Sequence, residues 1–180
     1  MSTPSHDLIV FGATSFVGQI LTRYLAETFG THGRLKWAIA GRSESKLAGL
    51  RNSLGLAAGK LPLVVADAED EPALRRMCKS TRVVISTVGP YALYGGPLVK
   101  VCAETGTDYC DLTGEVHWIR RMIHEHEAAA RKSGARIVHC CGFDSMPSDL
   151  GVLFLQQQAR ERFGQPCAEV KMRVKAMRGG

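Results

Sequence analysis

The segment Gly12–Gly18 constrains the fold of this chain more than any other part of its sequence. It follows the apolar run Leu8–Phe11 and opens a stretch, residues 16–25, with apolar side chains at helical spacing. A buried strand, a tight turn of small residues and a helix N-terminus together form a site for the pyrophosphate of a dinucleotide. Gly12 permits the sharp turn out of the strand, and Gly18 lets the helix pack close to the sheet. We therefore expect a nucleotide-binding strand–turn–helix unit at the N-terminus.

The middle position of this turn, usually glycine, is Ser15. Serine is still small, so the backbone can approach a phosphate, and its hydroxyl can donate a hydrogen bond to it. The alternative is an ordinary glycine-rich turn, because 19 glycines in 180 residues produce chance matches. The position between a strand and a helix favours the nucleotide site. The predicted cofactor contacts are Gly12, Ala13, Thr14, Ser15, Phe16, Val17 and Gly18.

The rest of the chain alternates apolar runs with segments of helical spacing. Strands are predicted at Leu8–Phe11, Leu35–Ala40, Leu61–Ala66, Val83–Ser86, Tyr109–Asp111 and Arg136–Cys140. Helices are predicted at Phe16–Phe29, Glu44–Leu54, Glu71–Lys79, Pro97–Glu104, Glu115–Ser133 and Pro147–Phe163. Strand–helix alternation with short, right-handed connections implies an α/β fold with a doubly wound parallel sheet, the Rossmann arrangement.

The last residues break this alternation. Ala168–Met177 alternates apolar and charged side chains, a period of two that is typical of a half-solvated strand in an antiparallel sheet. We therefore expect a Rossmann domain over residues 1–166. Residues 167–180 are expected to begin a missing α+β substrate domain with its first strand, which makes the chain a fragment. The alternative is an edge strand added to the Rossmann sheet.

Composition excludes several classes of protein. With 45% hydrophobic and 22% charged residues, the chain is typical of a globular domain, and no run approaches the about 20 apolar residues of a membrane span. The N-terminus is too short and polar for a secretory signal, so a cytoplasmic location is expected. The net charge of +6 comes from scattered basic residues without interleaved aromatic ones, which argues against nucleic-acid binding. The six cysteines and six histidines show no ligand spacing, so no metal is expected.

The end of the second predicted strand indicates which dinucleotide binds. NAD sites usually carry an acidic residue there, whereas this chain has Gly41-Arg42-Ser43. Arg42 offers a planar donor fork for a 2′-phosphate. Ser43 adds a hydroxyl at a helix N-terminus, and Lys46 adds a further charge. The sequence therefore favours NADP(H) over NAD(H), against the alternative that Arg42 is an ordinary surface residue.

Two more loops are expected at the same edge of the sheet. Asp67 and Ala68 follow the third strand, where Asp67 either hydrogen-bonds the adenine or simply forms a turn before the next helix. Val88, Gly89 and Pro90 follow the fourth strand and are expected to line the ribose and nicotinamide side.

Catalytic residues are harder to assign. The weak candidates are Tyr91, Tyr94 and Asp144, each of which is equally explained as a loop or capping residue. None of the four tyrosines is followed by Lys four residues later, so the chemistry of short-chain dehydrogenases is disfavoured.

Taken together, these segments resemble the saccharopine dehydrogenase-like oxidoreductases, which include the mycobacterial trans-acting enoyl reductases. The resemblance runs in order along nearly the whole chain, and Ser15 is a mild departure because the family commonly has glycine there. The segments that carry it are Val10–Gly18, Ala40–Ser43, Val88–Tyr91 with Tyr94-Gly95, Asp111–Glu115 and Gly142–Gly151.

The resemblance implies an NADP(H)- or NAD(H)-binding domain of an oxidoreductase that transfers a hydride to a C=C or C=N bond. The related enoyl reductases imply a small-molecule or lipid-type substrate. The resemblance assigns no catalytic acid or base, and the fragment alone is expected to bind cofactor without turnover. The alternative is a non-catalytic NADP-binding sensor or interaction module. The substrate stays unspecified, and a homo-oligomer stays open.

Overall fold

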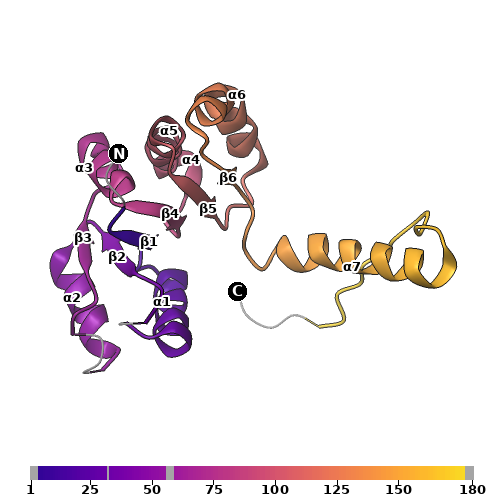
Figure 1. Ribbon diagram of the computed structural model, residues 1–180, viewed down its shortest axis with the longest axis horizontal. Helices are drawn as coiled ribbons and strands as arrows, with labels where there is room; N and C mark the ends of the chain where they lie inside the picture. Colours follow the sequence, from indigo (N-terminus) through magenta and orange to yellow (C-terminus); the bar gives the residue numbers. More distant parts are fainter. Residues whose placement is uncertain (1–3, 32, 56–58, 177–180) are drawn as a thin grey trace.

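The computed structural model describes residues 4–31, 33–55 and 59–176. Six parallel strands form one sheet in the order β3-β2-β1-β4-β5-β6, with the N-terminal strand near its centre (Figure 1). This order confirms the predicted doubly wound α/β fold. The strands are β1 (His6–Phe11), β2 (Trp37–Gly41), β3 (Leu63–Val65), β4 (Thr81–Ser86), β5 (Asp108–Asp111) and β6 (Ile137–Val138).

Helices follow the strands as expected, with one addition. The helices are α1 (Phe16–Phe29), α2 (Glu44–Ser53), α3 (Glu71–Lys79), α4 (Tyr91–Tyr94), α5 (Gly96–Thr105), α6 (Val116–Ser133) and α7 (Met146–Phe163). The short helix α4 was not predicted, because four residues are too few to show a helical period.

Two helical layers cover the sheet, because alternate side chains of each strand point to opposite faces. On one face, Val10 and Ile39 pack against α1 and α2. On the other face, Ile9 and Ala38 pack against α3, α5 and α6. The central strands β1 and β2 are therefore buried on both sides, which explains their continuous apolar sequences.

The C-terminal part departs from the prediction. Helix α7 extends away from the sheet (Figure 1), and it exposes apolar side chains around its circumference, among them Leu153 and Phe154. Residues 168–176, predicted as part of the first strand of a missing domain, form no strand within this chain, and Met177 lies outside the described residues. A segment with alternating apolar and charged residues forms a strand only where a neighbouring strand can pair with its backbone N–H and C=O groups. In the described part of the chain this segment pairs with no strand. The domain boundary near residue 166 stays a prediction.

Candidate nucleotide-binding site

A cavity of about 290 Å³ lies where the carboxyl ends of β1, β2, β3 and β4 meet. This is the crevice between the two halves of a doubly wound sheet, where ligands of such folds bind. The cavity brings together residues from four loops that are far apart in the sequence. Its lining residues are Phe11, Gly12, Thr14, Ser15, Gly41, Arg42, Ala66, Asp67, Ala68, Glu69, Thr87, Val88, Gly89 and Tyr94.

The turn between β1 and α1 requires both of its terminal glycines. Gly12 has φ +82°, a left-handed conformation that glycine adopts without strain. The N–H groups of Gly12 and Ala13 donate to the carbonyl oxygen of Ala40, at 2.9 and 3.1 Å, so the turn is tied to β2. A Cβ at Gly18 would lie 2.2 Å from the carbonyl oxygen of Gly12. Only glycine at position 18 therefore allows α1 to begin this close to the strand.

Ser15 is the N-cap of α1, and its hydroxyl has two partners. Its Oγ accepts from the N–H of Gly18 at 3.0 Å and donates to Thr87 Oγ1 at 3.0 Å. Thr87 Oγ1 in turn donates to the carbonyl oxygen of Gly12 at 2.8 Å. The hydroxyl of Ser15, expected to bind phosphate, thus donates instead to Thr87, just after β4.

The N-terminus of α1 has the chemistry that a pyrophosphate requires. Phe16 and Val17 begin the helix, so their N–H groups have no acceptor within it. The first turn of α1 carries no acidic side chain, so the positive end of the helix dipole is not neutralised there. The side chain of Phe16 is 80% exposed, and Ala13 is fully buried, so these residues would contribute through their backbone. The loop therefore fits a dinucleotide phosphate.

Arg42 directly follows β2 and lines the cavity, while its contact with a 2′-phosphate stays a prediction. Within the described ranges it makes no hydrogen bond or ion pair, so its guanidinium is free to bind an anion. Ser43 is the N-cap of α2, where its Oγ accepts from the N–H of Lys46 at 3.4 Å. Neither Ser43 nor Lys46 lines the cavity. Of the three predicted phosphate ligands, the structure places Arg42 alone in the cavity wall.

Asp67 and Ala68 line the cavity from the loop after β3. The carboxylate of Asp67 accepts from the N–H of Glu69 at 3.0 Å, so it stabilises a turn, and the following helix is capped by Asp70 instead. The turn-forming alternative for Asp67 is therefore confirmed, while a contact to adenine stays a prediction.

The loop after β4 contributes Val88 and Gly89 to the cavity, but not Pro90, and the short helix α4 contributes Tyr94. Tyr91 points into the protein, where its hydroxyl donates to the carbonyl oxygen of Ser86 at 2.9 Å. Burial raises the pKa of Tyr91 to about 12. Asp144 is exposed and lies outside the cavity lining. Among the three weak catalytic candidates, Tyr94 is the one that faces the cavity.

Sequence reasoning assigned no role to Thr87, Asp111 or Glu115, although all three stand at or just beyond strand ends. The buried carboxylate of Asp111 accepts from four groups at the ends of β5 and β6. Its Oδ1 accepts from the N–H groups of Thr113 and Cys140, both at 3.1 Å. Its Oδ2 lies 2.9 Å from the hydroxyl of Tyr109 and 2.7 Å from Nδ1 of His139. The available signal was an acidic residue at the last position of a predicted strand, Tyr109–Asp111.

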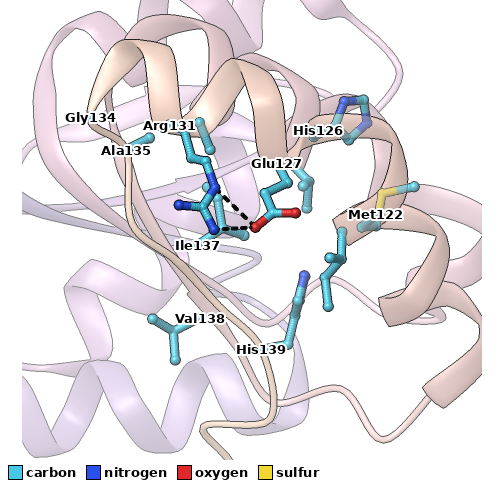
Figure 2. Close-up of a pocket in the computed structure, with 12 residues that line it drawn as sticks. Met122, His126, Glu127, Arg131, Gly134, Ala135, Ile137, Val138 and His139 are labelled. Atoms are coloured by element: carbon cyan, nitrogen blue, oxygen red, sulfur yellow. Dashed lines mark hydrogen bonds and ion pairs between the residues drawn. The ribbon is translucent and has the colours of Figure 1, made fainter.

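A second cavity, of about 560 Å³, lies between α6 and β6 (Figure 2) and shares no lining residue with the first. Its polar side chains are already paired. Arg131 donates to Glu127 at 2.7 Å, His126 lies 3.7 Å from Glu125, and His139 is held by Asp111. The remaining wall is mostly aliphatic, so this cavity offers no unpaired charge to a nucleotide.

Residues 4–31, 33–55 and 59–176 contain no group of three or more His, Cys, Asp or Glu side chains arranged to hold a metal ion. No helix there is long and apolar enough to cross a membrane.

Two mycobacterial proteins with sequences similar to this chain are named as reductases. A Mycobacterium tuberculosis protein provisionally named a trans-acting enoyl reductase is 43% identical over 174 residues, which are 97% of this chain and 41% of that protein. A trans-acting enoyl reductase of Mycobacterium leprae is 46% identical over 162 residues, or 89% of this chain and 38% of that protein. The chain thus spans about two fifths of the length of these relatives.

The fold also matches a solved structure. Saccharopine dehydrogenase (L-Glu forming) of Saccharomyces cerevisiae superimposes with a TM-score of 0.67 at 20% identity, covering 87% of this chain and 32% of the yeast chain. Residues 8–138 match the model of the saccharopine dehydrogenase NADP binding domain. The chain therefore belongs to the saccharopine dehydrogenase family, and its doubly wound sheet is the family's NADP-binding domain.

Proposed function

We propose that the full-length protein is an NADP(H)-dependent oxidoreductase that reduces the C=C bond of an enoyl group, and that this part of it holds the cofactor. The observation that carries the proposal is the cavity at the strand ends, with the free guanidinium of Arg42 at the end of β2. The names of the relatives that are 43% and 46% identical support an enoyl substrate. The proposed substrate is therefore a small molecule or a lipid-type chain that carries the enoyl group.

Each loop of the cavity has a proposed part in binding. The backbone of Gly12–Gly18 holds the pyrophosphate at the N-terminus of α1. Arg42 binds the 2′-phosphate, because guanidinium and phosphate pair through two parallel hydrogen bonds. Val88 and Gly89 lie beside the ribose and nicotinamide, and Pro90, predicted with them, follows outside the cavity lining. When bound, NADPH supplies the hydride of the reaction.

A proton must also reach the substrate. Tyr94 is the proposed donor within this chain, because its side chain lines the cavity and Tyr91 is committed to Ser86. Alternatively, a residue in another part of the full-length protein donates this proton.

Two other functions remain as alternatives. Hydride transfer to a C=N bond is favoured by the likeness in fold to a saccharopine dehydrogenase. A non-catalytic NADP-binding sensor is favoured because the described residues that line the cavity include no evident acid–base pair.

Cofactor selectivity tests the site. NADPH and NADH are titrated against the protein and against Arg42→Ala, with binding followed by nicotinamide fluorescence. Loss of a charged hydrogen bond should weaken NADPH by about 1.5–3 kcal/mol and leave NADH nearly unchanged. Arg120→Ala, on the exposed side of α6, is the matched control and should change neither affinity. Equal losses for both nucleotides in Arg42→Ala would contradict the 2′-phosphate role.

Turnover tests the reaction. The full-length protein is assayed for NADPH oxidation with enoyl thioesters and, separately, with imino acids. Turnover with enoyl thioesters alone supports the proposal, and turnover with imino acids alone favours the C=N alternative. Tight NADPH binding without turnover on either panel favours the sensor.

A further inference from the structure

Glu115 joins two loops at the carboxyl edge of the sheet. It stands between β5 and α6, as the N-cap residue of α6. Its two carboxylate oxygens accept from consecutive backbone N–H groups of another loop. Oε1 lies 2.7 Å from the N–H of Tyr91, and Oε2 lies 2.8 Å from the N–H of Ala92. Both oxygens of one side chain thus hold the start of α4.

Helix α4 depends on this contact because it has no cap of its own. Its N-cap residue is Pro90, which offers no side-chain acceptor, and the helix is only four residues long. The first N–H groups of any helix lack intrahelical acceptors. A carboxylate that accepts from them satisfies donors that would otherwise have no partner in the helix. Glu115 therefore supplies from another element the cap that α4 lacks.

The residues held in this way flank the nucleotide cavity. Gly89 precedes Tyr91 by two residues and Tyr94 follows it by three, and both line the cavity. The position of Tyr91 and Ala92 therefore sets where Gly89 and Tyr94 lie. Glu115 itself does not line the cavity, so it acts on the site only through α4.

Further contacts fix the loop that carries Glu115. Its own N–H donates to Thr113 Oγ1 at 3.1 Å, and the N–H of Thr113 donates to the buried carboxylate of Asp111 at 3.1 Å. The ring of Tyr91 packs against Trp118, with 5.5 Å between ring centroids. The two loops are thus joined through side chains as well as through the carboxylate.

We propose that Glu115 is a positioning residue for the nicotinamide half of the cofactor site, which it orders by capping α4. This inference rests on the proposed function, because it takes the loop after β4 as the nicotinamide side. The adenosine half, at Arg42 and Asp67, lies on other loops and has no contact with Glu115. Loss of the carboxylate should therefore affect one half of the cofactor and spare the other.

The experiment compares two ligands on the full-length protein. NADPH has both halves of the cofactor, whereas adenosine 2′,5′-bisphosphate has only the adenosine half with its 2′-phosphate. Binding of each is measured by calorimetry for the parent protein, Glu115→Ala and Glu115→Gln. Glu127→Ala, which removes an exposed carboxylate of α6 paired with Arg131, is the matched control.

Glu115→Ala should weaken NADPH about tenfold, because NADPH binding must then order α4 without the carboxylate, and it should leave the affinity for adenosine 2′,5′-bisphosphate unchanged. Glu115→Gln keeps one acceptor oxygen, so it should restore part of the NADPH affinity. Glu127→Ala should bind both ligands like the parent protein.

Three outcomes separate the possibilities. Equal weakening of both ligands in Glu115→Gln would overturn the positioning role in favour of general damage to the fold. Unchanged NADPH affinity in Glu115→Ala would overturn it directly. Failure of the parent protein to bind either ligand would overturn the proposed function, on which this inference depends. If Glu115→Ala does not fold, Glu115→Gln alone decides between the first outcome and selective weakening.

Discussion

The carboxylate of Asp111 lies 2.7 Å from Nδ1 of His139, and this contact joins the ends of β5 and β6 inside the protein. Asp111 is only 1% exposed, so its charge has almost no water around it. A buried carboxylate is stable only where hydrogen bonds replace its hydration. Asp111 has four such donors, of which Thr113 and Cys140 lie in the loops that follow the two strands.

Asp111→Asn should lower the free energy of unfolding by about 3 kcal/mol, because an amide group cannot accept from all four donors. Chemical denaturation measures this loss. Asp144→Asn, at an exposed site, is the control and should leave stability unchanged. Equal stability of the two variants would show that the Asp111 cluster contributes little.

Gly18→Ala should destabilise the protein by about 1–3 kcal/mol, because its Cβ would collide with backbone that cannot move aside. The colliding atoms are the carbonyl oxygen of Gly12 and the backbone of Ala13. The same substitution at Gly49, in α2, meets no atom within 4 Å and should stabilise the helix by about 0.5–1 kcal/mol. Thermal unfolding of both variants tests this opposite sign, and NADPH affinity should fall in Gly18→Ala alone.

The hydroxyls of Ser15 and Thr87 should act as a coupled pair. Ser15→Ala removes the N-cap of α1 and should cost about 1 kcal/mol of stability. Thr87→Val removes the bond to the carbonyl oxygen of Gly12 with little change in shape. Because the two hydroxyls bond each other, the double variant should lose less stability than the sum of the single losses. Strict additivity in denaturation experiments would contradict the coupling.

Tyr91 should make stability fall at high pH. Burial raises its pKa to about 12 in the folded protein, against an ordinary value of 10.0. The unfolded chain therefore loses the phenol proton first, so the contribution of Tyr91 is complete below pH 10.0 and is lost as the pH rises toward about 12. Tyr91→Phe should lose stability less steeply over this range. The measurement is denaturation at several pH values, with the absorbance of tyrosinate recorded in parallel.

Tyr109 limits the size of that effect. Burial also raises the pKa of Tyr109 well above its usual value, so some alkaline destabilisation should persist in Tyr91→Phe. Tyr24→Phe, which changes an exposed ring, is the control and should follow the parent protein. Identical pH profiles for Tyr91→Phe and the parent protein would contradict the assignment.

Elements with strong local signals were predictable from the sequence. Helices α1 and α3 begin and end at the predicted residues, because each has a side-chain cap and a regular apolar period. The edge strands were predicted too long: β3 covers Leu63–Val65 and β6 covers Ile137–Val138. Each edge strand pairs on one side only, so its ends are not held as those of β1 are. Apolar sequence alone does not reveal that difference.

The nucleotide-binding loop and Arg42 also show which features local sequence predicts and which depend on the tertiary structure. The turn at Gly12, the helix start after Ser15 and the position of Arg42 after β2 all follow from neighbouring residues, so a sequence pattern is enough to find them. Whether a predicted residue reaches the cavity depends on how four loops meet. The tertiary structure places Arg42 in the cavity wall and leaves Ser43 and Lys46 outside its lining.

Local patterns alone thus established a doubly wound sheet and a turn suited to a dinucleotide. Three contacts were decided by the tertiary structure: Ser15 with Thr87, Glu115 with Tyr91, and Asp111 with His139. They join residues 72, 24 and 28 positions apart. Strand order sets which loops become neighbours, and no periodicity or turn signal in the chain encodes the distance between two hydroxyls or between a carboxylate and a backbone N–H in different loops.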